Sequence, residues 1–323
     1  MSGGKPNHNP RIILTTGDPN GIGPEIILKI FSDSKFISKF DLSVLGNKKI
    51  FDHYSQETSL KNIPPEKIIE MDLPSGFMVT PGKISSKAGK ISGDSVLKAA
   101  HLCMRKEFDA MVTLPLSKES LNLGGFNYPG HTEMLKEITD SGEVVMILHS
   151  AKFSVALITG HIPVKKISGA LTRGTIIKKL ITINNSLVKD FGIRSPSIGM
   201  LSLNPHAGDG GMIGNEETDV IIPAMDELNS VGFRIRGPYS SDAYFANKSY
   251  RRFNITAAVY HDQGLIPFKM IAFDKGVNFT AGLKIIRTSP DHGTAFDIAG
   301  TGRADPQSTY EAIKLAAKLV KKK

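Results

Sequence analysis

The sequence contains no tryptophan and almost no cysteine. Cys103 is the only cysteine among 323 residues, which excludes an intrachain disulfide and a cysteine-rich metal site. No apolar run approaches the roughly 18 residues that suggest a membrane span, and residues 1–11 form a polar tail without the apolar core of an export signal. We therefore expect a cytoplasmic location, and any bound metal must be held by histidine and carboxylate.

The sequence also lacks two common nucleotide-binding motifs and the pattern of basic and aromatic residues that is typical of nucleic-acid-binding surfaces. The chain has neither GxGxxG nor GxxxxGK[ST], so a plain Rossmann or P-loop assignment is unsupported. The net charge is +9, but lysine and arginine are scattered apart from the C-terminal KLAAKLVKKK, and aromatic residues do not alternate with basic clusters. An anionic small-molecule substrate accounts for the excess positive charge better than nucleic acid or a membrane does.

The pattern of apolar runs predicts the fold class. Hydrophobic residues make up 40% of the chain and charged residues 22%, as in globular proteins. Helical and strand-like segments alternate, which favours an α/β protein with a mostly parallel sheet. The predicted strands are 11–17, 41–46, 109–117, 144–150, 153–161, 196–204, 257–261 and 276–283. The predicted helices are 24–33, 93–107, 131–139, 171–192, 215–230 and 307–323.

Three apolar, strand-like runs each end in a histidine, at His161, His206 and His261. Functional groups of parallel sheets gather at the carboxyl ends of the strands. A single histidine in this position is usually structural, but three in one context favour a shared metal site. Three neutral imidazoles would leave an open coordination position, as catalytic sites do. Asp209 and Asp262 are candidate partners of these histidines.

A second group of residues suits an anion. His131 opens a predicted helix whose exposed backbone N–H groups favour a phosphate or carboxylate, unless Thr132 simply caps that helix. Lys269, Asn278 and Arg287 follow in later apolar segments. Arginine binds oxyanions through its forked N–H groups and lysine supplies a point charge, so these residues would suit a phosphate.

Long, ordered motifs support a resemblance to a known family. The chain resembles the 4-hydroxythreonine-4-phosphate dehydrogenases of vitamin B6 biosynthesis over nearly its whole length from about Arg11 onward. The motifs are TTGDPNGIGPEI, GHTE, ITGH, LNPHAGDGGMIGNEE, YHDQGL, GVNFTAGL and IRTSPDHGTAFDIAGTGRADP. GDPNGIGPE and HGTAFDIAG are also similar to segments of the isocitrate and isopropylmalate dehydrogenases, which bind the dinucleotide without a Rossmann fingerprint.

The resemblance implies a fold, an assembly and a set of site residues. It implies two α/β/α domains with mostly parallel sheets, as in isocitrate and isopropylmalate dehydrogenases, with the active site in the cleft between them. The first domain would comprise 1–128 and 255–323, and the second, with most of the contact in a homodimer, 129–254. The implied metal ligands, in a site completed across the dimer interface, are His161, His206 and His261. The implied substrate contacts are His131, Thr132, Lys269, Asn278 and Arg287.

Other roles follow by analogy or from the chemistry. His292 and Asp297 in HGTAFDIAG are similar to an adenine-side cofactor loop. Asp242 and Asp262 are candidates for the base that accepts the substrate hydroxyl proton. SSDAYF at 240–245 departs from the more apolar run usual in the family, which puts the substrate wall beside Asp242 in doubt.

The implied reaction is oxidation of 4-phosphooxy-L-threonine by NAD or NADP, followed by decarboxylation to 3-amino-2-oxopropyl phosphate. It needs one divalent metal per site, and zinc, cobalt and magnesium all remain open. Three alternatives also remain: a dehydrogenase for another phosphorylated hydroxy acid such as 4-phospho-threonate or phospho-erythronate, a three-histidine metal hydrolase, and a non-catalytic sensor. The presence of all three histidines favours an enzyme.

Overall fold

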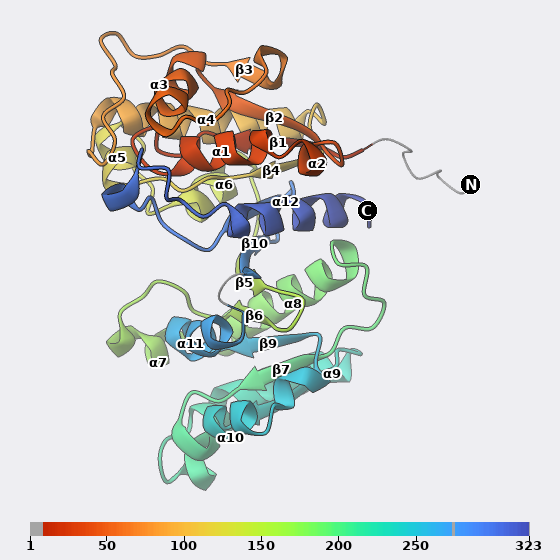
Figure 1. Cartoon of the computed structure of the whole chain (residues 1–323). Helices are drawn as coiled ribbons and strands as arrows, with labels where there is room; N and C mark the ends of the chain where they lie inside the picture. The colour runs from red at the N-terminus through yellow and green to blue at the C-terminus, as the bar shows by residue number, and fades with distance from the viewer. Residues whose placement is uncertain (1–8, 273–274, 323) are drawn as a thin grey trace. The chain divides into compact units, whose positions relative to one another are not determined.

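A computed structural model describes residues 9–272 and 275–322. The chain divides into two compact units, which are described separately (Figure 1). Unit 1 runs to Ser141 and resumes over Leu283–Lys321, and unit 2 contains Gly142–Gly282. The sequence-based division instead changed domain after residue 128 and again after residue 254. Strands at Ile255–Ala258 and Val277–Ala281 pair with strands of unit 2, which explains why this unit extends to Gly282.

Unit 1 contains a parallel sheet with strand order β3-β2-β1-β4-β11. Its strands are β1 (Arg11–Thr15), β2 (Asp41–Gly46), β3 (Ile68–Glu70), β4 (Ala110–Val112) and β11 (Arg287–Pro290). Its α-helices are α1 (Gly23–Ser32), α2 (Ser34–Ile37), α3 (Lys48–Thr58), α4 (Ser86–Met104), α5 (Lys118–Leu123), α6 (His131–Ile138) and α12 (Gln307–Val320). Short 3-10 turns are η1 (Pro65–Lys67) and η7 (Phe296–Ile298).

The core of unit 1 explains its sequence pattern. Ile12, Ile13 and Leu14 in the central strand β1 are fully buried. Such an uninterrupted apolar run is expected where helices cover both faces of a parallel sheet. Helix α12 packs against β11 and β4, and α4 packs against β1 and β2. Cys103 in α4 is buried, and burial raises the pKa of its thiol to about 12.

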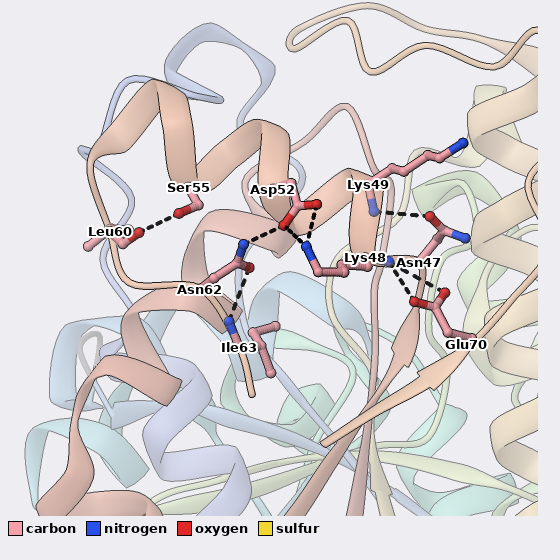
Figure 2. Close-up of polar contacts among 9 residues, drawn as sticks. All are labelled: Asn47, Lys48, Lys49, Asp52, Ser55, Leu60, Asn62, Ile63 and Glu70. Atoms are coloured by element: carbon pink, nitrogen blue, oxygen red, sulfur yellow. Dashed lines mark hydrogen bonds and ion pairs between the residues drawn. The ribbon is translucent and has the colours of Figure 1, made fainter. Parts of the chain in front are cut away.

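Polar contacts fix the start of α3 (Figure 2). Asn47 precedes the helix, and its side-chain oxygen accepts from the backbone N–H of Lys49 at 3.0 Å. The Lys48 N–H donates to Glu70 at the end of β3 (3.1 Å), and the Lys48 ammonium pairs with Asp52 one turn along (2.7 Å). An N-cap of this kind contributes roughly 1 kcal/mol to helix stability. Helix α3 was not predicted, although Asn47 is a typical start signal.

Unit 2 contains strands in the order β10-β5-β6-β9-β7-β8. They are β5 (Val145–His149), β6 (Ser154–Leu157), β7 (Ile198–Leu201), β8 (Ile235–Tyr239), β9 (Ile255–Ala258) and β10 (Val277–Ala281). The α-helices are α7 (Ile167–Ala170), α8 (Arg173–Lys189), α9 (Ile222–Ser230), α10 (Ser241–Ala246) and α11 (His261–Ala272). Other turns are η2 (Val164–Lys166), η3 (Pro205–Gly211), η5 (Ser249–Arg252) and the π-helical η4 (Glu217–Ile221).

The prediction of an α/β protein with a mostly parallel sheet is confirmed. In unit 2, β6, β9, β7 and β8 are mutually parallel, and only β5 runs antiparallel to its neighbours β10 and β6. Helix α11 packs on β6 and β9, where Phe268 is buried together with Phe153 and Leu157. Within residues 9–272 and 275–322, no helix has both the length and the hydrophobicity that a bilayer span needs.

Candidate active site

The three histidines follow three adjacent parallel strands of unit 2: His161 follows β6, His261 follows β9 and His206 follows β7. The β6–β9 ladder continues one step beyond the strands, because the backbone N–H and hydroxyl of Thr159 donate to the Val259 carbonyl at 3.0 and 2.7 Å. His161 and His261 both lie two residues farther on, and their ring centroids are 5.2 Å apart. The sheet therefore brings these two imidazoles together.

His206 differs from that pair in its exposure and in its backbone conformation. It is exposed, and it lies in η3 with a left-handed backbone (φ +52°). In the part of the chain that the structure describes, no three His, Cys, Asp or Glu side chains come together as a metal-binding group. The three-histidine metal site therefore stays a prediction. Two of its predicted members, His161 and His261, lie close enough together to share a metal ion, and His206 is not placed with them.

Two carboxylates lie beside these histidines. Asp262 is the second residue of α11, and its Oδ1 is 2.7 Å from Nδ1 of His261. A carboxylate there stabilises the tautomer with hydrogen on Nδ1, which leaves Nε2 to bind a metal. Asp242 lies in the first turn of α10. Its pKa is lowered below the usual value, first by the hydrogen bond from Ser240, then by the Ala243 N–H and, more weakly, by His206. Asp242 is thus a carboxylate at neutral pH.

Gln263 joins the segments that carry these groups, and sequence reasoning missed it. This buried side chain accepts from the Val259 N–H at 2.6 Å, just after β9. Its amide group donates to the Ser202 carbonyl after β7 (2.6 Å) and to the Ser241 hydroxyl at the start of α10 (2.8 Å). One glutamine therefore links the ends of two strands to the helix of Asp242. The sequence signal that could have identified Gln263 is its position in YHDQGL, one of the motifs that support the family resemblance.

The other substrate residues expected in unit 2 are Lys269 and Asn278. Lys269 lies in the last turn of α11 and is half-buried. Asn278 is in β10, and among the described residues its buried Oδ1 has no hydrogen-bond donor. A buried acceptor without a donor lowers the stability of the folded state by roughly 1–3 kcal/mol. A ligand that donates a hydrogen bond to this oxygen would remove that cost.

His131, Thr132 and Arg287 belong to unit 1, where His131 begins α6. Gly130 occupies the N-cap position of this helix, and no side-chain cap hydrogen bond is found there among the described residues, so the alternative role of Thr132 as an N-cap is not seen. Arg287 in β11 is 2% exposed, and its Nε and one terminal nitrogen donate to the Thr113 hydroxyl at 2.9 and 2.7 Å. Burial lowers the pKa of Arg287 to about 10, which leaves it charged at neutral pH.

Arg287 affects the protonation of His131. Burial, and then the nearby Arg287 charge, lower the pKa of His131 well below 6.5. Its Nε2 atom is buried and has no hydrogen-bond partner within the described parts of the chain. A neutral imidazole and a buried guanidinium thus share the start of α6, where helix N–H groups and positive charge both favour an anion.

The expected cofactor residues also lie in unit 1. His292 and Asp297 flank a turn whose Thr294 carbonyl accepts from the Ile22 N–H at 3.0 Å. The contact joins the two segments, GDPNGIGPE and HGTAFDIAG, that resemble the wider dehydrogenase group. Asp297 is exposed, whereas Nε2 of His292 is buried and has no partner in the described residues. Burial lowers the pKa of His292.

Comparison with known proteins identifies the family. A family model described as pyridoxal phosphate biosynthetic protein PdxA matches residues 28–316. The chain belongs to the PdxA family. A relative from Sulfurihydrogenibium sp. (strain YO3AOP1), named 4-hydroxythreonine-4-phosphate dehydrogenase, is 42% identical over 95% of this chain and 97% of its own length. The resemblance inferred from the motifs is thereby confirmed.

Among the other relatives, one has a solved structure and one is named for a different substrate. The crystal structure of 4-hydroxythreonine-4-phosphate dehydrogenase from Klebsiella pneumoniae has a TM-score of 0.86, with 33% identity, and the match covers 97% of this chain and 100% of that chain. A Salmonella typhimurium protein named D-threonate 4-phosphate dehydrogenase is 36% identical over 95% of this chain and 98% of its own length. Both names denote oxidoreductases.

Proposed function

We propose that this PdxA-family chain oxidises 4-phosphooxy-L-threonine with NAD or NADP and decarboxylates the product to 3-amino-2-oxopropyl phosphate, a step of pyridoxal phosphate biosynthesis. The family match supports the reaction class. The observation that carries the proposal is the pairing of His161 and His261, 5.2 Å apart after adjacent parallel strands. Histidine pairs at this edge of a sheet suit a catalytic divalent ion.

The residues of unit 1 would bind the phosphate. Arg287 is held by Thr113 and stays charged, so it would present a fixed positive charge to a phosphate. His131 is neutral because of burial and the Arg287 charge, and it can donate or accept one hydrogen bond. Together with Thr132 and the N–H groups that begin α6, they supply donors for a phosphate. From unit 2, Lys269 and the unsatisfied amide of Asn278 would complete the substrate contacts.

The metal would be held by His161, His261 and His206, with the third histidine supplied across a homodimer interface. A bound divalent ion lowers the pKa of a substrate hydroxyl and polarises a neighbouring carbonyl. Asp262 orients His261 through Nδ1. Asp242, which is ionised at neutral pH, would accept the hydroxyl proton, directly or through a water. His292 and Asp297 would contact the adenosine part of the dinucleotide.

The test follows absorbance at 340 nm after metal-loaded protein is mixed with 4-phosphooxy-L-threonine and either NAD or NADP. We expect a rise in absorbance that a chelator stops and that added zinc, cobalt or magnesium restores. A chelator-resistant rise would exclude the metal role, and a metal hydrolase would produce no rise at all. Folded, metal-loaded protein that forms no NADH or NADPH with any phosphorylated hydroxy acid would overturn the proposal.

A second substrate deserves the same assay, because the Salmonella typhimurium relative is named D-threonate 4-phosphate dehydrogenase. This compound carries a hydroxyl where 4-phosphooxy-L-threonine carries an amino group, and the phosphate and metal contacts can be the same for both. The ratio of the two kcat/KM values decides between them. A ratio in favour of the threonate would assign this chain to the second activity.

A further inference from the structure

The segment that carries His206 has an unusual backbone. Five consecutive residues have left-handed backbone angles, with φ between +45° and +83°: His206, Ala207, Gly208, Asp209 and Gly210. Three of them are not glycine, and a left-handed conformation costs such residues about 1–2 kcal/mol each. Conformations of this kind persist only where the surroundings impose them, and they are concentrated at functional sites.

A buried carboxylate binds the residues that lead into this segment. Glu217, at the start of the π-helical turn η4, is 1% exposed. One of its oxygens accepts from the backbone N–H groups of Leu203 and Asn204, both at 2.8 Å. The other accepts from the Asn204 side-chain amide at 2.8 Å. Glu217 therefore holds the two residues that precede Pro205 and His206.

Glu217 also reaches the middle of the same turn. A Cβ atom placed on Gly208 would lie 2.9 Å from the second oxygen of Glu217 and 2.6 Å from the Gly214 carbonyl. The turn is thus closed tightly over the carboxylate, and only glycine fits at position 208, where φ is +83°. Contacts before and inside the left-handed run converge on one side chain.

The neighbouring Glu216 also accepts hydrogen bonds, one of them from outside the turn. It accepts from the Asn204 amide at 2.7 Å and from the Ser168 hydroxyl at 2.7 Å, which ties the turn to α7. Both of these hydrogen bonds come from side chains, whereas Glu217 accepts from the backbone N–H groups of Leu203 and Asn204. Of the two adjacent glutamates, the buried one is therefore placed to control the histidine.

We propose that Glu217 is a positioning residue whose buried carboxylate holds the left-handed turn at 206–210 and thereby presents His206 to the metal. The inference rests on the proposed function, because it takes His206 to be a ligand. A purely structural role for Glu217 would be seen in the stability of the protein and not in its metal affinity.

The test replaces Glu217 with glutamine, which has the same size. Glutamine can still accept from the two backbone N–H groups, but its amide nitrogen would face the Asn204 amide, donor against donor. We expect the affinity of the metal-free protein for Co²⁺, titrated by calorimetry and by the visible absorption of the bound ion, to fall about 10- to 100-fold, as it does when groups that orient metal ligands are lost. The metal-free protein should stay folded, with a melting temperature that is modestly lowered because the two donors face each other in a buried place.

Two further variants show whether a negative result concerns Glu217 or the metal site itself. Asp219→Asn removes an exposed carboxylate two residues away and should bind Co²⁺ as the unchanged protein does. His206→Ala should lose the high-affinity Co²⁺ site. If His206→Ala binds Co²⁺ normally, the metal assignment in the proposed function is wrong. If His206→Ala loses the site while folded Glu217→Gln binds normally, the proposal for Glu217 is wrong.

A milder variant covers the case in which Glu217→Gln does not fold. Asn204→Ala removes the side-chain donor that Glu217 shares with Glu216 and leaves both backbone N–H donors to Glu217 in place. It should weaken Co²⁺ binding in the same direction but by a smaller factor. Unchanged Co²⁺ affinity in folded Asn204→Ala, together with loss in His206→Ala, would overturn the proposal.

Discussion

At the scale of single residues, the candidate site contains polar atoms that are buried without partners. Nε2 of His131 and Oδ1 of Asn278 are both in this state among the described residues. A ligand, an ion or an ordered water satisfies such atoms in folded proteins. The family resemblance of the sequence predicted both residues as substrate contacts. It could not show their burial, because burial depends on packing partners far away in the chain.

The lowered pKa of His131 predicts a pH dependence of stability. Its folded-state pKa lies well below 6.5, so below that pH the unfolded chain binds a proton that the folded chain excludes. The free energy of unfolding should therefore fall on acidification from about pH 7 to about pH 5, with a slope from this group of at most about 1.4 kcal/mol per pH unit. His131→Gln should flatten that dependence, measured by urea unfolding of the metal-free protein at each pH.

His101→Gln serves as the control for this prediction, because His101 is exposed near the end of α4. That variant should keep the full pH dependence of the parent protein. The pKa of His292 is lowered as well, so some dependence should remain in His131→Gln. An unchanged slope in His131→Gln would mean that His131 accepts a proton as easily in the folded state as in the unfolded one.

At the scale of helices and strands, the sequence predicted most of the elements that have a regular apolar pattern. The strand at 41–46 matches β2, and the helix expected at 131–139 matches α6 to within one residue. The strand expected at 109–117 is much shorter, because β4 ends at Val112. Periodicity marks apolar runs well, but it does not show where ladder hydrogen bonds stop.

The elements nearest the histidines were the hardest to predict. Helix α11 begins at His261 and contains Pro267, which normally argues against a helix interior. Its burial on β6 and β9 outweighs that cost. The left-handed turn at 206–210 has no simple sequence signal, since three of its five residues are not glycine. Long-range contacts, such as those of Glu217, create both features.

Glycine packing between helices gives a prediction at this scale. A Cβ atom on Gly89 in α4 would lie 1.6 Å from the Ser120 carbonyl in α5, whereas Gly174 in α8 has no atom within 4 Å. Gly89→Ala should lower the free energy of unfolding by about 1–3 kcal/mol through overpacking. Gly174→Ala should raise it by up to about 1 kcal/mol, because alanine favours helix.

Urea unfolding of the two alanine variants beside the parent protein measures both effects. The same chemical change in two helices should thus have opposite signs. Equal effects in the two variants would show that helix propensity alone, and not the close approach of α4 to α5, governs Gly89. The approach matters for the site because α4 also packs against α6, the helix that His131 begins.

At the scale of the whole molecule, the predicted roles divide between the two units. The metal and base candidates belong to unit 2, together with Lys269 and Asn278, and the other substrate and cofactor candidates belong to unit 1. Of the three predicted histidine ligands, all of which lie in the described part of the chain, His161 and His261 are paired, and no larger metal-binding group is found among the described residues. Sequence motifs identify ligands but carry no information on which copy of the chain supplies each one, so this property needs an experiment on the assembly.

Complementation between inactive chains tests whether the metal site is shared in a homodimer. His206→Ala and His261→Ala, carrying different affinity tags, are expressed together, and the mixed dimer is isolated with both tags in turn. If His206 and His261 of one site come from different chains, the mixed dimer has one intact ligand set and one that lacks both histidines. Its activity should be about half that of the parent dimer, because a two-fold dimer has two equivalent sites.

The two parental homodimers supply the baseline, since each lacks one ligand in both sites and should be inactive. A mixed dimer of two differently tagged His206→Ala chains should be inactive as well, which excludes an effect of the tags. If a single chain provided all three ligands, neither site of the mixed His206→Ala and His261→Ala dimer would be complete. An inactive mixed dimer that still binds the phosphorylated substrate would therefore place the whole metal site within one chain, and His206 would have to move toward His161 and His261 when the metal binds.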